Sequence, residues 1–379
     1  MFRFLHASDL HLGKPFGRHA EDVRGRLRQA RHGALQRLAQ AAREGGAETI
    51  LLAGDTFDQE TPAPTVTRQA LNAMAQAPDL KWMIMPGNHD SLAVTELWQT
   101  VARDKPDNVL LLLEPVPVIV AGAAILAAPC TARNPGRDLT ADMDQPTPEG
   151  LVRIGLGHGG IHDFAAAGSA APDGPSGIIA PDRAAQADLD YLGLGDWHGQ
   201  IRVTANTWYS GTPEPDSFKH PQTGRALLVE IVARRAPPLV TPVSVGALAW
   251  QRVTLDLTPG EAIEALLGDV LPAMALRRDT LVELVGRGRL GLRERHRLQA
   301  SLDCTAPDFL SFASDLTQVQ LAQQDADLDG IDPSGGALRQ AAETLTARTQ
   351  DPDLSVHDRR IALSALSHLF SFVAVEDAT

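Results

Sequence analysis

Short apolar runs that end in glycine, aspartate or histidine recur through residues 2–232 and limit the folds open to this chain. The runs have the length of strands, and helical stretches alternate with them. The stretch over residues 27–42 has an apolar stripe with arginines opposite. Such alternation predicts an α/β layered domain rather than a helical bundle. The runs cover residues 2–7, 49–53, 82–85, 109–113, 123–127, 152–156, 191–194 and 226–232.

Polar clusters that follow these runs have the residue types of a metal or catalytic site. Open α/β sheets place ligands beyond the carboxyl ends of their strands, so loops far apart in sequence can meet there. Glycines let the backbone turn sharply beside such a crowded site. The clusters are Asp9-x-His11, Gly54-Asp55-x-x-Asp58, Gly87-Asn88-His89-Asp90, Gly157-His158 and Gly195-Asp196-x-His198.

The clusters supply carboxylate, imidazole and carboxamide ligands but no thiolate. Mixed oxygen and nitrogen ligands suit manganese, iron or zinc better than calcium. The ligands are too many for one ion and enough for two that lie about 3.5–4 Å apart, the arrangement used in phosphoryl displacement. One such cluster alone is more often structural than functional. All of them in order, each after an apolar run, favour a functional site.

The ordered clusters resemble the calcineurin-like metallophosphoesterase superfamily, whose blocks run D-x-H, G-D-x-x-D, G-N-H-D/E, H and G-H-x-H. Within it, the chain is most similar to the SbcD branch of DNA-repair exonuclease subunits, which includes the YhaO-like proteins. Residues 209–218 (YSGTPEPDSF) resemble the segment after the last metal block of that branch, and residues 250–289 resemble its capping domain. The resemblance implies a layered β-sandwich flanked by helices, then a small α+β capping domain and a helical C-terminal region.

The resemblance also implies a role for each site residue. His89 would stabilise or protonate the leaving oxygen, and Asp90 would orient its ring. Two divalent metal ions are expected, Mn²⁺ first, with iron or zinc as alternatives. One ion would be bound by Asp9, His11 and His198 and the other by Asn88, His158 and Asp196, with Asp55 bridging both.

Two positions depart from the family pattern. The last block has His where this chain has Asp196, and many nuclease members have His where it has Asp58. If Asp196 binds metal, three carboxylates face two ions and we expect firmer ion binding. The alternative is that Asp196 lies behind the ligands and one ion is weak or absent. Asp58 could orient a ligand or shape the mouth of the site.

Changes in composition along the chain predict three regions. We expect a metallophosphoesterase domain with a dinuclear site over residues 1–235, a small β–α–β domain over 236–291, and a mainly helical region over 292–379 that could bind a partner. The boundary is placed at the Pro-rich step of residues 236–238. Residues 165–185, rich in Ala, Gly, Pro and Ser, read as a long surface loop. The apolar spacing over 358–373 predicts a helix that packs on its own domain or on a partner.

The formal net charge of −13 argues against a protein that holds nucleic acid through bulk electrostatics. The two cysteines, Cys130 and Cys304, cannot form a disulfide framework and favour a reducing compartment. The sequence shows no signal peptide and no apolar stretch long enough to span a membrane. We therefore expect a cytoplasmic location without membrane association.

Three functions remain open at this stage. The leading prediction is a metal-dependent phosphoesterase that hydrolyses phosphodiester bonds as a DNA exonuclease or endonuclease subunit in DNA repair. An SbcC/YhaN-like coiled-coil ATPase would be its partner, and the chain could form a homodimer. The alternative enzyme cleaves a small molecule, either a cyclic nucleotide or a phosphomonoester, since fold does not decide substrate. The third reading is a scaffold without catalysis.

Overall fold

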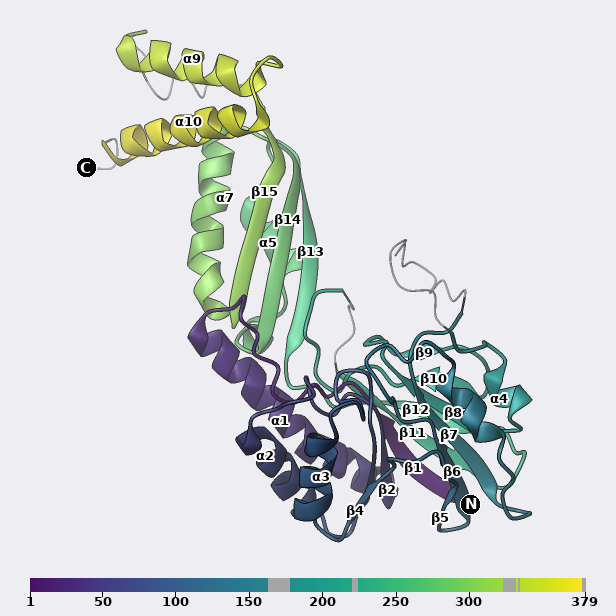
Figure 1. Ribbon diagram of the computed structural model, residues 1–379. Helices are drawn as coiled ribbons and strands as arrows, with labels where there is room; N and C mark the ends of the chain where they lie inside the picture. The colour runs from purple at the N-terminus through teal and green to yellow at the C-terminus, as the bar shows by residue number, and fades with distance from the viewer. Residues whose placement is uncertain (163–177, 220–223, 323–331, 333–334, 377–379) are drawn as a thin grey trace. The chain divides into compact units, whose positions relative to one another are not determined.

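Two six-stranded sheets pack face to face in the first of two units into which the chain divides, Met1–Trp250 and Gln251–Thr379. The computed structural model describes residues 1–162, 178–219, 224–322, 332 and 335–376 (Figure 1). The predicted loop over residues 165–185 lies mostly outside them. Among the described residues, no helix combines the length and apolarity needed to cross a membrane.

The first sheet has a parallel half and an antiparallel edge. Its order is β12-β11-β1-β2-β3-β4, and β1 to β4 run parallel while β11 and β12 are antiparallel to their neighbours. Because β1, β2 and β3 are parallel neighbours, their carboxyl ends lie at one edge. The strands are β1 (Phe2–Ala7), β2 (Thr49–Ala53), β3 (Lys81–Met85), β4 (Val109–Leu111), β11 (Arg225–Ile231) and β12 (Leu239–Ser244).

The second sheet has the order β5-β6-β7-β8-β10-β9. Strands β6, β7, β8 and β10 are parallel, so the ends of β7 and β8 also share an edge. The strands are β5 (Val118–Val120), β6 (Ala123–Ala127), β7 (Val152–His158), β8 (Tyr191–Gly195), β9 (Ile201–Arg202) and β10 (Thr207–Tyr209).

Side-chain alternation along the strands builds the layers. Phe2 and Phe4 of β1 enter the apolar core between the two sheets, while Leu5 of the same strand faces the helices. Helices α1, α2 and α3 cover the outer face of the first sheet (Figure 1). The predicted α/β layered β-sandwich flanked by helices is confirmed. The helices of this unit are α1 (Glu21–Glu44), α2 (Pro64–Ala75), α3 (Thr95–Asp104), α4 (Arg183–Gln186) and the 3₁₀ turn η1 (Leu139–Asp144).

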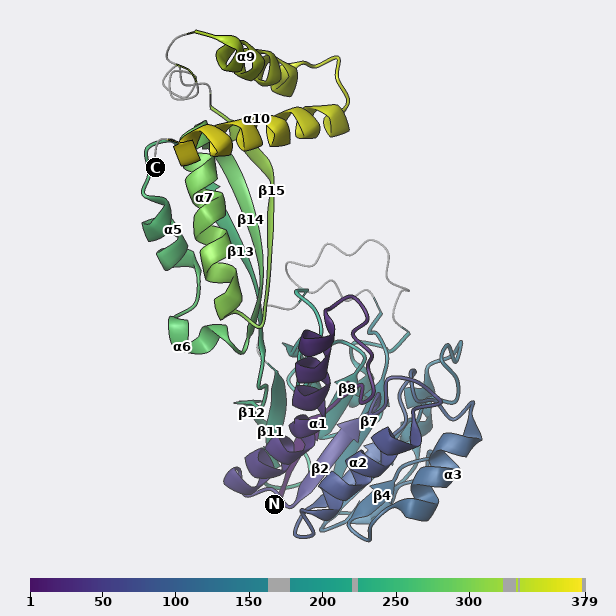
Figure 2. The ribbon, with the colours of Figure 1, turned by 90° about the vertical axis from the view of Figure 1, so that its left-hand side faces the viewer.

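The second unit contains a three-stranded sheet of order β13-β14-β15. Helices α5 and α7 lie along one face of this sheet, and α9 packs beside α10 (Figure 2). Its strands are β13 (Ala249–Leu257), β14 (Thr280–Leu290) and β15 (Ser311–Leu321). Its helices are α5 (Ile263–Val270), α6 (Met274–Arg277), α7 (Leu292–Thr305), η2 (Ala306–Asp308), α9 (Ala337–Gln350) and α10 (Val356–Glu376).

The structure divides the chain at a different place from the Pro-rich step. Strand β12 follows that step and pairs with β11, so it completes the first sheet, and the division falls after Trp250. The region 292–379 is also not purely helical, because β15 lies in it and pairs in parallel with β14. Residues 358–373 do form a helix, and its Leu366 packs on Leu292 and Ala342 of the same unit.

Candidate metal centre

Four residues of the predicted site have a strained backbone. Asp9, His11, Asp55 and Asp196 have φ angles of 56°, 44°, 53° and 95°. Positive φ is uncommon outside glycine and costs on the order of 1–3 kcal/mol for each residue. Backbone hydrogen bonds from Asp9 N to Gly54 O (3.1 Å) and from His11 N to Asp55 O (2.9 Å) hold two of these loops together. Strain concentrated in the loops after β1, β2 and β8 marks them as a functional site.

Glycines make room for the side chains of the site. A Cβ atom on Gly54, whose φ is +91°, would lie 2.2 Å from His158 Nδ1. A Cβ atom on Gly87 would lie 2.2 Å from Asp55 Oδ1. Both positions therefore require glycine, because a larger residue would displace a predicted metal ligand.

The first group of ligand-type side chains is Asp9, His11 and His198, whose donor atoms all lie within 4.8 Å of one another. The Nε2 atoms of the two histidines are 3.1 Å apart, and Asp9 Oδ1 lies 3.9 Å from His198 Nε2. Two nitrogens that each bind one ion at about 2.0–2.1 Å are about 3 Å apart when they meet it at a right angle. The spacing therefore fits two ligands of one ion.

The second group is Asp9, Asp55 and His158. His158 Nδ1 lies 2.8 Å from Ala53 O, so this nitrogen donates a proton to the carbonyl and Nε2 is left with its lone pair. Asp55 Oδ2 lies 3.5 Å from His158 Nε2 and 3.5 Å from His11 Nε2. This one oxygen thus stands between the two groups, as a bridging ligand would.

Asn88 and Asp196 lie beside the second group. Asn88 Nδ2 donates to Asp196 Oδ1 at 3.3 Å, and that oxygen lies 4.0 Å from His158 Nε2. The backbone N–H of Asp196 donates to Asp9 Oδ1 at 3.1 Å. Asp196 is the most exposed of these ligands, with 36% of its side chain accessible. Within the described part of the chain it joins none of the three tight groups, the third of which is His11, Asp58 and His89.

His89 and Asp90 are held by different contacts from those expected. The His89 ring donates from Nδ1 to Asp58 O (2.9 Å), and its centroid lies 4.8 Å from that of the His11 ring. The carboxylate of Asp90 instead accepts from Gly87 N at 2.6 Å and Phe57 N at 3.0 Å. Through these contacts Asp90 fixes the turn that carries His89, and its predicted role in orienting the His89 ring stays a prediction. Burial and the Asp55 charge raise the pKa of Asp90 to about 7.

Two carboxylates lie behind the histidines of the first group. Asp58 Oδ1 lies 3.2 Å from His11 Nδ1, which matches the first of the two roles that the sequence left open for it. Asp216 Oδ1 lies 3.3 Å from His198 Nδ1, and sequence analysis assigns Asp216 no role of its own. Although burial opposes its ionisation, neighbouring positive charge holds the pKa of Asp216 well below its usual range. Asp216 stands in the segment 209–218, and it also accepts a hydrogen bond from Lys14 in the loop after β1. The two residues are 202 positions apart, so the sequence spacing could not predict this contact.

Buried polar atoms without a hydrogen-bond partner show whether a cation fits the metal centre. His158 Nε2 and Asn88 Oδ1 are buried without a hydrogen-bond partner, and both lie in the second group or beside it. Burial opposes protonation of His158, but the Asp55 and Asp9 carboxylates raise its pKa well above the usual value. The same carboxylates would favour a bound cation. Clustered oxygen and nitrogen donors therefore suggest a divalent metal site.

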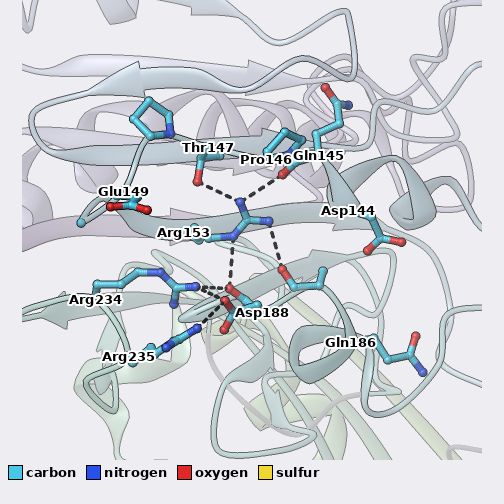
Figure 3. A pocket seen from close by; sticks show the side chains of 13 residues that line it. Asp144, Gln145, Pro146, Thr147, Glu149, Arg153, Gln186, Asp188, Arg234 and Arg235 are labelled. Atoms are coloured by element: carbon cyan, nitrogen blue, oxygen red, sulfur yellow. Dashed lines mark hydrogen bonds and ion pairs between the residues drawn. The ribbon is translucent and has the colours of Figure 1, made fainter.

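A separate pocket of about 570 Å³ is lined by three arginines that already have hydrogen-bond or ion-pair partners within the protein (Figure 3). Arg153 donates to backbone carbonyls that include those of Asp188 (3.2 Å) and Ala187 (3.0 Å). Arg234 and Arg235 pair with the Asp188 carboxylate at 2.6 and 3.1 Å. These guanidinium groups stabilise the fold, and we assign no ligand to this pocket.

The comparisons with known proteins agree with this reading of the site. Residues 2–165 match the family model for calcineurin-like phosphoesterases. This match supports the superfamily and suggests a metal-dependent hydrolase. No protein of curated description matches the chain significantly.

Two solved structures show distant similarity. The crystal structure of TT1561 of Thermus thermophilus is 12% identical, with a TM-score of 0.40 over 64% of this chain and 99% of the other. GAP50, described as the anchor in the inner membrane complex of Plasmodium, is 10% identical, with a TM-score of 0.33 over 65% and 88%. At these scores neither similarity carries an argument about this chain.

Proposed function

We propose that the chain is a dinuclear-metal-dependent phosphodiesterase that cleaves DNA as the nuclease subunit of a repair complex. The observation that carries the dinuclear part is the position of Asp55 Oδ2, 3.5 Å from the Nε2 atoms of both His11 and His158. A single carboxylate between two imidazoles is the arrangement expected where two ions share a ligand. We propose Mn²⁺ as the physiological ion, with iron or zinc as alternatives.

The chain's own residues have distinct tasks in this proposal. Divalent ions bound here would supply charge neutralisation and a water of lowered pKa. The ligands hold those ions and fix where the phosphate lies. One ion would be held by Asp9, His11 and His198 and the other by Asn88, His158 and Asp196, with Asp55 as the shared ligand.

His89 is the proposed proton donor to the leaving oxygen. Its Nδ1 is engaged by Asp58 O at 2.9 Å, so Nε2 is the nitrogen that remains for a substrate. When the ring is protonated, Nε2 can donate to the oxygen that departs from phosphorus. Asp90 contributes to this step indirectly, because it holds the turn that positions His89.

DNA is proposed as the substrate on two features beyond the metal centre. Residues 209–218 and residues 250–289 both resemble the SbcD branch. A chain of net charge −13 would need basic surface from elsewhere, and an SbcC/YhaN-like ATPase would supply it. We propose this partner, a homodimeric assembly and a cytoplasmic location together with the nuclease.

The test is digestion of end-labelled linear DNA by purified protein in Mn²⁺. Single- and double-stranded substrates run side by side with a His89→Ala preparation, which exposes contaminating nuclease. Cleavage by the wild type alone would support the proposal, and the fragment pattern separates exonuclease from endonuclease. If bis(p-nitrophenyl) phosphate or a cyclic nucleotide is cleaved while DNA is untouched, with and without the ATPase, the substrate is a small molecule.

A further inference from the structure

Two carboxylates lie directly behind the histidines of the first metal group. Asp216 Oδ1 is 3.3 Å from His198 Nδ1, and Asp58 Oδ1 is 3.2 Å from His11 Nδ1. In each ring the other nitrogen, Nε2, is the one that faces the site, and these two Nε2 atoms are 3.1 Å apart. Each imidazole is therefore held between a carboxylate on one side and the proposed ion position on the other.

Lys14 connects the two carboxylates. Its Nζ lies 2.7 Å from Asp216 Oδ2 and 4.0 Å from Asp58 Oδ1. The side chain of Asp216 is 7% exposed, so this ion pair is largely shielded from water. Shielding strengthens the attraction, because opposite charges interact more strongly where the effective dielectric constant is low.

A second cation fixes Asp216 from inside the fold. Arg31 of α1 is 1% exposed, and its Nη2 lies 3.8 Å from Asp216 Oδ2. The same guanidinium donates to Leu10 O at 2.6 Å and to Glu214 O at 2.9 Å. Arg31 thereby joins the loop after β1, which carries His11 and Lys14, to the segment 209–218, which carries Asp216.

We propose that Asp216 is a positioning residue that acts through His198 on one of the two ions. Asp58 lies 3.2 Å from His11 Nδ1 but makes no hydrogen bond with it, so its effect on that ring is electrostatic, and Lys14 pairs with both carboxylates. A carboxylate at Nδ1 holds the proton on that nitrogen, so that Nε2 keeps the lone pair that a metal requires. This inference rests on the proposed metal centre and is independent of the substrate.

The test measures Mn²⁺ affinity rather than turnover. Removal of a carboxylate that supports a metal-bound histidine typically weakens metal binding by about 10–100-fold. We therefore expect Asp216→Ala to weaken one of two Mn²⁺ equilibria by that factor in a calorimetric titration, with the other unchanged. Asp216→Glu, which keeps a carboxylate, should recover part of the loss.

The matched control is Asp188→Asn. Asp188 also pairs with arginines, Arg234 and Arg235, but in the pocket of Figure 3. This variant should leave both Mn²⁺ equilibria unchanged, so a general effect of lost ion pairs would be visible. Circular dichroism spectra establish that the compared proteins are folded.

A second variant keeps the proposal testable if Asp216→Ala does not fold. Lys14 is 29% exposed, and Lys14→Met should weaken the same equilibrium while Lys14→Arg restores it. Unchanged Mn²⁺ affinity in folded Asp216→Ala, or in Lys14→Met where the first variant is unfolded, overturns the inference. Two tight ions without any DNA cleavage would instead count against the nuclease and leave this inference standing.

Discussion

Replacing Gly54 by alanine should separate backbone strain from damage to the metal centre. The added Cβ atom would lie 2.2 Å from His158 Nδ1 and 2.8 Å from the Cα atom of Gly87. Because the backbone of Gly87 cannot move away easily, we expect the imidazole to shift. It would then lose its hydrogen bond to Ala53 O and turn Nε2 away from Asp55.

Gly122→Ala provides the matched control. Gly122 has φ +86° against +91° for Gly54, and no atom lies within 4 Å of its added Cβ. Both substitutions therefore carry the cost of a left-handed alanine, about 1–2 kcal/mol. Only Gly54→Ala adds the loss of a buried hydrogen bond, about 1–3 kcal/mol. With about 2–4 °C per kcal/mol for a unit of this size, Gly54→Ala should melt about 2–12 °C below the control.

Tryptophan fluorescence during thermal unfolding in EDTA is the suitable assay. Four of the five tryptophans precede β13 and all five lie within Met1–Trp250, so their emission reports chiefly on the first unit. Mn²⁺ titrations of the same preparations should show two ions in Gly122→Ala and a weakened equilibrium in Gly54→Ala. Equal melting temperatures together with equal Mn²⁺ affinities would refute the reasoning.

Three further changes test the remaining assignments. His89→Ala should lower the rate of DNA phosphodiester cleavage, whose alkoxide leaving group needs a proton, by about 10²–10⁴-fold, and metal analysis should find its Mn²⁺ content unchanged because His89 is not a proposed ligand. Asp196→His should keep both ions if position 196 ligates directly; loss of both in the same analysis would contradict that role. Mn²⁺ at 100 times its Kd should add about 2.7 kcal/mol of stability per site over protein in EDTA, and an unchanged melting temperature would argue that the groups bind no ion.

The first unit is the part of the fold most open to prediction. The strands expected over residues 2–7, 49–53 and 123–127 are β1, β2 and β6, with these same bounds. Each is buried almost throughout, so its sequence is a continuous apolar run. Strand β15 escapes prediction because most of its side chains are polar or exposed and it stands at a sheet edge, where pairing rather than burial specifies the strand.

In the site, too, the features that depend on neighbouring residues could be predicted, and those that depend on distant segments could not. Residues that follow strands can be foreseen, and the structure does bring the loops of all five predicted clusters together. The contacts of Asp90 and Asp216 cannot be foreseen, since both depend on which backbone amide or side chain arrives from a distant loop. The residues next to each carboxylate in the sequence do not show whether it binds a metal or positions another residue that does.

The proposed ligands come from both sheets of the sandwich. Asp9, His11, Asp55 and Asn88 follow strands of the first sheet, whereas His158 ends β7 and His198 follows β8 of the second. Ions bound between them would join two layers that also meet through apolar contacts and through hydrogen bonds such as that of His158 to Ala53 O. The described part of the chain has two free cysteines, Cys130 and Cys304. Metal would thus act as a reversible cross-link between layers, and a chelator would remove its contribution to their stability.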